Sequence, residues 1–227
     1  LFSSLDKGIE SLKTAQQQLK VYRQAVLKWA FEGRLTNSNT NKWNFETFKE
    51  CLKFSQGFQV DVELQSEIKK SGQIRFLRII DFTQGNEPER YIDHPGEKYF
   101  VAKDDISIVR YGASTGFVCS GKEGIIANNL FKIEPNQKIN KRFLFYFLKS
   151  SFFQQFIAKN VKGAAMPAIS FGLINDIVLP IPPTLEEQHR IVSEIEKRLS
   201  VADKLEESIA TALQQAEALR QSILKKA

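Results

Sequence analysis

The sequence contains only two cysteines and two histidines among its 227 residues. Cys51 and Cys119 lie far apart and form no Cys-x-x-Cys pair, which argues against a disulfide framework and favours reduced thiols. His94 and His189 are remote from each other and from both cysteines. A zinc site needs several such ligands at short spacings, so we expect no bound metal ion.

Long apolar runs are also missing. No stretch approaches the roughly 18 consecutive apolar residues of a membrane-spanning helix, and no charged-then-apolar leader stands at the N-terminus. The sequence therefore predicts a soluble, cytoplasmic protein that makes no contact with a membrane.

The motifs of several enzyme classes are absent. The Asn/Asp-Pro-Pro-aromatic motif of amino-methyltransferases does not occur, since the one Pro-Pro pair, Pro182-Pro183, follows Ile181. No Gly-x-Gly loop follows a strand, and no Gly-x-x-x-x-Gly-Lys-Ser/Thr loop is present to hold a nucleotide. We therefore expect neither catalysis nor a cofactor.

The net charge is +6, with an isoelectric point near 9.2. A moderate positive charge spread along the chain is compatible with a protein that reads a nucleic acid. Many proteins with uncharged partners have the same balance, so the charge alone leaves both possibilities open.

The two ends of the chain are versions of one helix. Shifted by 197 positions, Ser3–Ala30 aligns with Ser200–Ala227 without a gap, and 14 of the 28 aligned positions are identical. Some of the identical pairs, such as Gln17/Gln214 and Gln18/Gln215, are surface positions that a helix core does not require. A repeat that brackets one globular region predicts a modular, two-fold design.

Both repeated segments carry apolar residues at alternating spacings of three and four, as in a coiled coil. The last helix has a clear start, since Pro182-Pro183 is followed by a Thr184-x-x-Glu187 capping box. The first helix ends where the globular region begins, and the last helix begins where that region ends. If the two helices pair with each other, they must therefore run antiparallel; the alternative is that each apolar stripe is covered by another chain. The residues that we expect in the helix seam or in the docking of partner subunits are Leu12, Leu19, Tyr22, Val26, Trp29, Gln188, Ile209, Leu219 and Ile223.

The middle of the chain is predicted to be a mixed α/β domain. Period-two and short apolar runs indicate strands at 74–80, 105–110, 117–119, 130–133 and 177–181. A helix is expected over 143–159, with Phe145, Leu148, Phe152 and Phe156 packed into the core. Ser170 is expected to cap a helix over 171–175. The predicted organisation is a helix over 1–36, a globular domain over 37–183, and a second helix over 184–227.

Several stretches resemble one known family. They are Leu179–Val192, with its Pro-Pro-x-x-Glu-Gln junction, Ala218–Ala227, the matching copy Arg23–Leu35, and the internal motifs Ile108–Gly116 and Gly163–Ser170. Over essentially its whole length the chain resembles the specificity subunit of Type I restriction–modification systems. The junction is the most specific of these features.

The resemblance implies a mixed α/β target-recognition domain on a long antiparallel two-helix coiled coil, without catalytic activity. It implies binding of double-stranded DNA at one half of a split site and docking of methyltransferase subunits, with restriction subunits joining through the complex. A full subunit carries two recognition domains, whereas this chain has one. It is therefore expected to be half of a two-domain subunit, or a half-size subunit that forms a homodimer and reads a palindromic split site.

A DNA reader needs cations for phosphates and amide, guanidinium or hydroxyl groups for base edges. The leading candidates follow a predicted strand, in Arg110-Tyr111-Gly112 and Ser114-Thr115-Gly116, where glycines permit close approach; a tight turn explains them equally well. Arg75 and Arg78 lie three apart on a predicted strand and should point to opposite faces. The other candidate DNA contacts are Gln56, Lys69, Lys70, Asn128, Asn129, Lys162 and Gly163.

One alternative remains open at this point. A coiled-coil scaffold that binds only proteins would show the same repeat and the same heptads. Such a scaffold would show no salt-dependent binding of duplex DNA. A specificity subunit would show such binding. The DNA target itself is not readable from one chain.

Overall fold

The computed structural model describes residues 2–161 and 168–226. The chain forms two compact units. The helical unit consists of Leu1–Asn39 and Arg190–Ala227, and the α/β unit of Thr40–His189. Lys162 and Gly163, two of the predicted DNA contacts, lie outside the described residues.

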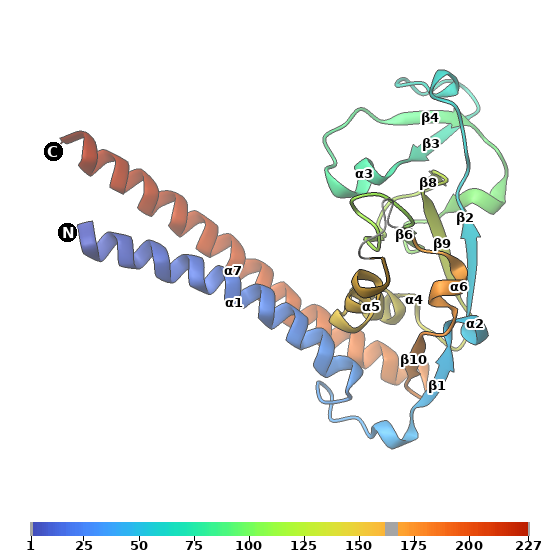
Figure 1. Cartoon of the computed structure of the whole chain (residues 1–227), viewed down its shortest axis with the longest axis horizontal. Helices are drawn as coiled ribbons and strands as arrows, with labels where there is room; N and C mark the ends of the chain where they lie inside the picture. The colour runs from blue at the N-terminus through green and yellow to red at the C-terminus, as the bar shows by residue number, and fades with distance from the viewer. Residues whose placement is uncertain (1, 162–167, 227) are drawn as a thin grey trace. The chain divides into compact units, whose positions relative to one another are not determined.

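The helical unit contains α1 (Phe2–Phe31) and most of α7 (Leu185–Lys226). Near the end of α1, Arg23 contacts Asp203 and Glu206 of α7. Near the beginning of α1, Asp6 contacts Arg220. The helices therefore run antiparallel, as the repeat predicts (Figure 1).

The seam of this helix pair is only partly enclosed. Val26 is fully buried, whereas Leu219 remains 54% exposed. The other predicted seam residues, Leu12, Leu19, Tyr22, Trp29, Ile209 and Ile223, are half-buried. Within the described helices, the apolar stripe is thus only partly enclosed, and part of it remains accessible to solvent.

Three β-sheets build the α/β unit (Figure 1). One antiparallel sheet has the order β2 (Leu52–Gln56), β9 (Leu130–Pro135), β6 (Ile106–Val109) and β7 (Val118–Cys119). A mixed sheet has the order β4 (Arg90–Asp93), β3 (Gln73–Leu77), β8 (Gly124–Ile126) and β5 (Phe100–Val101), with β3 and β8 parallel. A two-stranded ribbon pairs β1 (Asn44–Thr47) with β10 (Val178–Ile181).

Short helices connect and cover these sheets. They are α2 (Phe48–Cys51), α3 (Ile79–Thr83), α4 (Lys141–Lys149), α5 (Ser151–Val161) and α6 (Phe171–Asn175), with single 3-10 turns at Thr40–Lys42, Val62–Leu64 and Glu97–Tyr99. Phenylalanines supply the largest of the fully buried side chains. Phe48 is fully buried, and its ring centroid lies 6.0 Å from that of Phe147 and 6.1 Å from that of Phe153.

The structure corrects two predicted elements. The strand expected over 74–80 ends at Leu77, because Arg78 caps α3 and the next residues turn into that helix. The helix expected over 143–159 is two helices, broken at Ser150, whose backbone is extended and whose hydroxyl donates to the carbonyl of Phe147.

The expected core stripe of that helix is also partly wrong. Leu148 is fully buried, but Phe152 is 59% exposed, and Phe145 and Phe156 are half-buried. The residues that fill the core are instead Phe143, Phe147, Phe153 and Ile157. The break at Ser150 changes the helical phase, so one stripe cannot run through both helices.

Two predicted caps are confirmed. The Ser170 hydroxyl accepts a hydrogen bond from Leu173 N at the start of α6, at 3.1 Å. The Thr184 hydroxyl accepts one from Glu187 N at the start of α7, also at 3.1 Å. The Glu187 carboxylate additionally accepts a bond from the indole of Trp43 at 3.2 Å, which ties α7 to the segment before β1.

Gln188 is fully buried at the start of α7. Its side-chain carbonyl accepts from Asn140 N, and its amide donates to the carbonyls of Lys138 and Pro182. The expectation that Gln188 belongs to a partner-docking surface is therefore wrong, because every polar atom of its side chain is used inside the α/β unit.

Across the described ranges, no helix combines the length and the hydropathy required to cross a membrane.

Candidate nucleic-acid interface

Backbone hydrogen bonds connect loops at the ends of several strands of the α/β unit. Arg110, just after β6, donates its backbone N–H to the carbonyl of Asn129 at 2.8 Å and accepts from Ile169 N at 2.7 Å. Ala127 N donates to the carbonyl of Leu77, at the end of β3, at 2.9 Å. These backbone bonds place Arg110, Asn128, Asn129 and Arg78 on connected loops, although they are far apart in the sequence.

Gly57 adds the end of β2 to the same group of loops. Gly57 N donates to the carbonyl of Leu130, and Phe58 N to the carbonyl of Ile126. A side chain at position 57 would place its Cβ 2.2 Å from the carbonyl oxygen of Ala127. Only glycine permits this approach, which brings the exposed Gln56 next to the Asn128 loop.

The loop between β6 and β7 is shaped by two glycines with left-handed backbone, Gly112 (φ 98°) and Gly116 (φ 88°). Within it, the Thr115 hydroxyl donates to the carbonyl of Gly112 at 2.6 Å. Gly116 O accepts from the side chain of Gln154, and a Cβ at position 116 would meet Ile157 at 2.9 Å. The loop is therefore held against α5, with Thr115 used internally.

Tyr111 and Ser114 lie in the same loop. Both are half-buried, and Tyr111 forms an isolated β-bridge with Ala168. Their side chains thus remain candidates for contact with a ligand.

Asn129 has an unusual environment. Its side-chain carbonyl oxygen is buried and has no hydrogen-bond partner among the described residues. An unpaired buried acceptor costs about 1–3 kcal/mol. Such an atom is tolerated where a ligand or another segment completes its hydrogen bond.

A cavity of about 280 Å³ opens beside Asn128. Its lining includes the apolar side chains of Phe58, Val60 and Phe76 and the polar side chains of Arg78 and Asn128. Gln59 also lines it, and so do Arg90 and Gln65, which sequence reasoning missed. No signal in the sequence connects these residues, because they come from separate segments.

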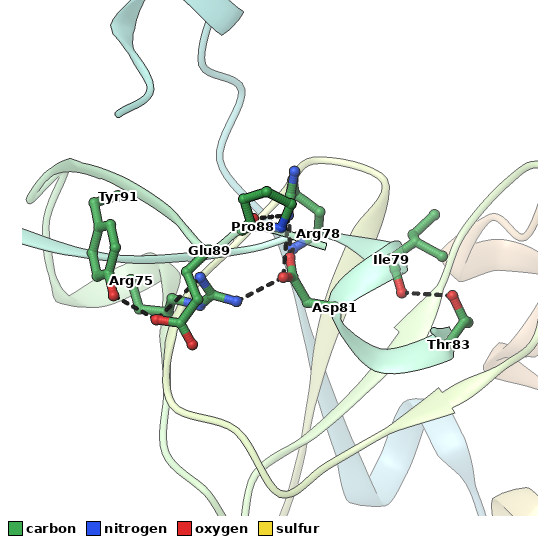
Figure 2. Close-up of polar contacts among 8 residues, drawn as sticks. All are labelled: Arg75, Arg78, Ile79, Asp81, Thr83, Pro88, Glu89 and Tyr91. Atoms are coloured by element: carbon green, nitrogen blue, oxygen red, sulfur yellow. Dashed lines mark hydrogen bonds and ion pairs between the residues drawn. The ribbon is translucent and has the colours of Figure 1, made fainter. Parts of the chain in front are cut away.

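Arg75 and Arg78 do not point to opposite faces, which corrects the sequence-based expectation. Both guanidinium groups contact the buried Asp81, Arg75 at 2.6 Å and Arg78 at 3.0 Å (Figure 2). The strand ends at Leu77, so the period-two rule no longer applies at position 78. The Asp81 carboxylate also accepts from Arg78 N at 2.8 Å.

Further contacts occupy both arginines. Arg78 donates to the carbonyl of Pro88 at 2.8 Å. Nη1 of Arg75 lies 3.4 Å from the carboxylate of Glu89, which also accepts from the Tyr91 hydroxyl (Figure 2). That ion pair is too poorly aligned to be a hydrogen bond. Arg75 is mostly buried, and its ion pairs with Asp81 and Glu89 give it a structural role.

Lys69 and Lys70 are exposed but lie away from this group of loops. Lys70 N donates to the side chain of Gln73, at the beginning of β3, whereas Arg78 follows the end of that strand. At about 3.3 Å per residue, the five residues of β3 separate the two ends by roughly 17 Å.

In the described parts of the chain, no group of three or more His, Cys, Asp or Glu residues is placed to hold a metal ion. Burial raises the pKa of Cys119 to about 12. Burial, together with Glu46 and Glu50, raises the pKa of Cys51 to about 12. Both thiols therefore stay protonated at neutral pH and are poor nucleophiles.

The sequence of residues 36–215 matches the family model described as Type I restriction modification DNA specificity domain. The chain is 28% identical over 254 residues to the specificity subunit of the Type I restriction enzyme EcoBI from Escherichia coli, covering all of this chain and 53% of that protein. It is 28% identical over 246 residues to the StySPI specificity subunit from Salmonella potsdam, covering all of this chain and 52% of that protein.

Solved structures show the same fold. The HsdS subunit from Thermoanaerobacter tengcongensis superposes with a TM-score of 0.68 at 20% identity, over all of this chain and 55% of that one. The S subunit from M. genitalium superposes with a TM-score of 0.59 at 19% identity, over 99% of this chain and 58% of that one. The chain thus spans about half the length of the relatives it matches.

Proposed function

Because this chain belongs to the family of Type I restriction modification DNA specificity domains, we propose that it binds one half of a split double-stranded DNA target. In this proposal the α/β unit is the target-recognition domain, and the chain is a non-catalytic part of a methyltransferase and endonuclease complex. The observation that carries the proposal is the convergence of Arg110, Asn128 and Asn129 on connected loops, within a domain of this family.

The chemistry of these loops suits base reading. An asparagine amide pairs with the edge of adenine through one donor and one acceptor, and a guanidinium pairs with guanine. Asn128, Asn129 and Arg110 supply these groups, while Gly57 lets its backbone approach that of Ala127.

Arg75 and Arg78 have a supporting role in this proposal. Asp81 holds both guanidinium groups in fixed positions, and Arg78 borders the cavity beside Asn128. Tyr111, Ser114, Gln56, Lys69 and Lys70 remain proposed contacts to phosphates or to base edges.

The paired helices α1 and α7 would hold two recognition domains at a fixed separation and dock methyltransferase subunits, with restriction subunits joining through them. The accessible side of the apolar stripe, including Leu219, supports a protein partner, because exposed apolar stripes on helices favour burial. The second recognition domain would come from a further part of the polypeptide or from a second copy.

The test is a binding titration of a complete subunit assembled with its cognate methyltransferase. Asn128→Ala and Asn129→Ala should change which duplex is preferred, because they remove base contacts. Gln137→Ala, an exposed amide in the turn after β9, should leave the preference unchanged. If the protein bound only proteins, no variant would change duplex affinity, and the unsubstituted complex would show no salt-dependent binding.

A further inference from the structure

Asp81 is a buried carboxylate that holds two arginines. The first turn of α3 fixes its position, because the carboxylate accepts a hydrogen bond from Arg78 N at 2.8 Å. The Arg78 side chain donates from Nε at 3.0 Å and from Nη2 at 3.2 Å, and Nη2 of Arg75 donates at 2.6 Å (Figure 2). Only 2% of the Asp81 side chain is exposed, and a carboxylate buried to this degree depends on such partners to compensate its charge.

The ion pairs around this carboxylate are electrically balanced. Arg75 also contacts Glu89 at 3.4 Å. Arg90, which lines the same cavity as Arg78, contacts Glu67 at 2.8 Å. The three arginines thus face three carboxylates, and these six groups together attract a polyanion no more than a neutral surface does. A contact between one of these arginines and a ligand therefore depends on where its donors lie, and not on net charge.

One nitrogen of the Arg78 guanidinium is left over. Asp81 accepts from Nε and Nη2, and Nη2 also donates to the carbonyl of Pro88 at 2.8 Å. Nη1 has no hydrogen-bond partner among the residues that the structure describes, and it is not buried. Since 21% of the Arg78 side chain is exposed, the two N–H groups of Nη1 are available to a ligand.

The mixed sheet places Arg78 beside Asn128. Leu77 lies opposite Ile126 in the parallel pair of β3 and β8, and Arg78 and Asn128 follow these residues by one and two positions. Both side chains line the cavity of about 280 Å³. The half-buried Asn128 amide also forms no hydrogen bond with any described residue. Two unused polar groups from different strands therefore lie at one cavity.

We propose that Arg78 reads a guanine of the DNA half-site through Nη1, and that Asp81 is the positioning residue that fixes Arg78 for this contact. The inference rests on the proposed function of the α/β unit and assigns one specificity-determining donor within it. A single nitrogen with several N–H groups can donate to both O6 and N7 of guanine, as a lysine ammonium does. Adenine carries an amino group in place of O6, so the same donor discriminates against it.

Asp81 determines whether Arg78 reads a base or acts as a mobile charge. A free arginine side chain loses rotamer freedom when it binds. The bonds to Asp81 and to the Pro88 carbonyl already hold the Arg78 guanidinium, so this loss occurs during folding and not during binding. Without them, the same cation would contact phosphates in any register, which gives affinity without sequence preference.

The test is selection from a duplex library with a randomised half-site, using the complete subunit in its methyltransferase complex. Arg78→Gln should reduce the preference for guanine at one position by at least about fivefold and leave the other positions unchanged. Asp81→Asn should reduce the same preference and strengthen binding to scrambled duplex, because it frees a cation for phosphates. Once Arg78 is replaced, Asp81→Asn should change the preference no further.

Asp105→Asn is the matched control. Asp105 is likewise a carboxylate held by two cations, Lys132 at 3.1 Å and Lys141 at 2.6 Å, but it does not line the cavity beside Asn128. Its replacement should leave the base preference unchanged. Should Asp81→Asn fail to fold, Asp81→Glu takes its place, because it keeps the charge but displaces the carboxylate by one methylene and should reduce the same guanine preference.

Three results would overturn the inference. The first is an unchanged base preference in Arg78→Gln while the unsubstituted complex selects a motif. The second is loss of preference at a position where the unsubstituted complex selects a base other than guanine. The third is equal weakening of all duplexes by the Asp81 variants with the guanine preference intact, which would make Asp81 a purely structural residue. Selection of no motif by the unsubstituted complex would instead remove the proposed function itself.

Discussion

The guanidinium of Arg23 on α1 forms an ion pair with the carboxylate of Asp203 on α7. The 197-residue repeat maps Arg23 onto Arg220 and Asp203 onto Asp6, and these two residues form an ion pair of their own. Antiparallel pairing of two copies of one helix produces each contact twice, related by a two-fold axis. The axis passes near Thr14 and Thr211, midway between the paired positions of each helix.

The first prediction concerns this pair. Asp203→Arg should destabilise the antiparallel helices by no more than about 1 kcal/mol, because the carboxylate is exposed. Arg23→Asp combined with Asp203→Arg should recover most of that stability, measured by urea unfolding as a double-mutant cycle. Asp61→Arg, at an exposed position in the α/β unit, is the control. Equal destabilisation by the single and double variants would contradict the pairing.

Replacement of Gln188 should reduce the stability of the fold by a larger amount. Gln188→Ala removes three hydrogen bonds and leaves the backbone groups of Asn140, Lys138 and Pro182 without that partner. The free energy of unfolding should fall by at least about 2 kcal/mol, because buried polar groups lose their partners. Gln137→Ala, an exposed amide nearby, should change it by less than about 0.5 kcal/mol. Unchanged stability of Gln188→Ala would show that the residue acts outside the fold.

The lowered pKa of Asp105 predicts that the free energy of unfolding depends on pH. Burial tends to raise its pKa, but hydrogen bonds from Lys141, Ala102 N and Lys132 prevail and hold it below its ordinary value. The resulting stabilisation is complete above the unfolded value of about 3.9 and is lost as the pH falls through the lower folded value. Urea unfolding at several pH values should show it.

The free energy of unfolding of the native protein is compared with that of the Asp105→Asn variant. The native protein should exceed this variant in stability by a constant amount at pH 5–7, and the difference should shrink below about pH 3.9. Asp104→Asn, whose side chain is 71% exposed, should show little of this dependence. A difference that grew on acidification would contradict the direction of the pKa shift.

Two glycines should respond in opposite directions to the same substitution. Gly57→Ala should cost about 1–3 kcal/mol, because its Cβ would overlap the backbone of Ala127. Gly8→Ala meets no atom within 4 Å and lies within α1, so it should add about 0.5–1 kcal/mol. Thermal unfolding measures both. A tolerated alanine at position 57 would contradict the close approach of β2 to the Asn128 loop.

Much of the fold was predictable from local patterns. The repeat and the heptads predict the antiparallel helices, since equal sequences that bracket a domain can pair in only one direction. The caps at Ser170 and Thr184 were predictable because they depend on residues within one turn. The strands around 106–109 and 130–135 follow from period-two and apolar runs.

Tertiary contacts determined those features of the fold and of the candidate site that local sequence patterns did not predict. Ile79 and Ile80 extend an apolar strand pattern, but the pairing of Arg75 and Arg78 with Asp81 favours a turn into α3. Phe145 has the spacing of a core residue, yet Arg142 and Lys149 stack on it at the surface. The convergence of Arg110, Asn128 and Asn129 depends on pairing between distant strands, which no local spacing encodes.

The most direct measurement is a genome-wide map of adenine methylation in cells that express the complete protein with its cognate methyltransferase subunit. The account predicts methylation within a split motif and a changed half of that motif when Asn128 and Asn129 are replaced by alanine. A palindromic motif would mean that two copies of this chain pair, and an asymmetric motif would mean a second, different recognition domain. Methylation without any sequence motif, in cells where the folded complex is present, would contradict the claim that this chain reads DNA sequence.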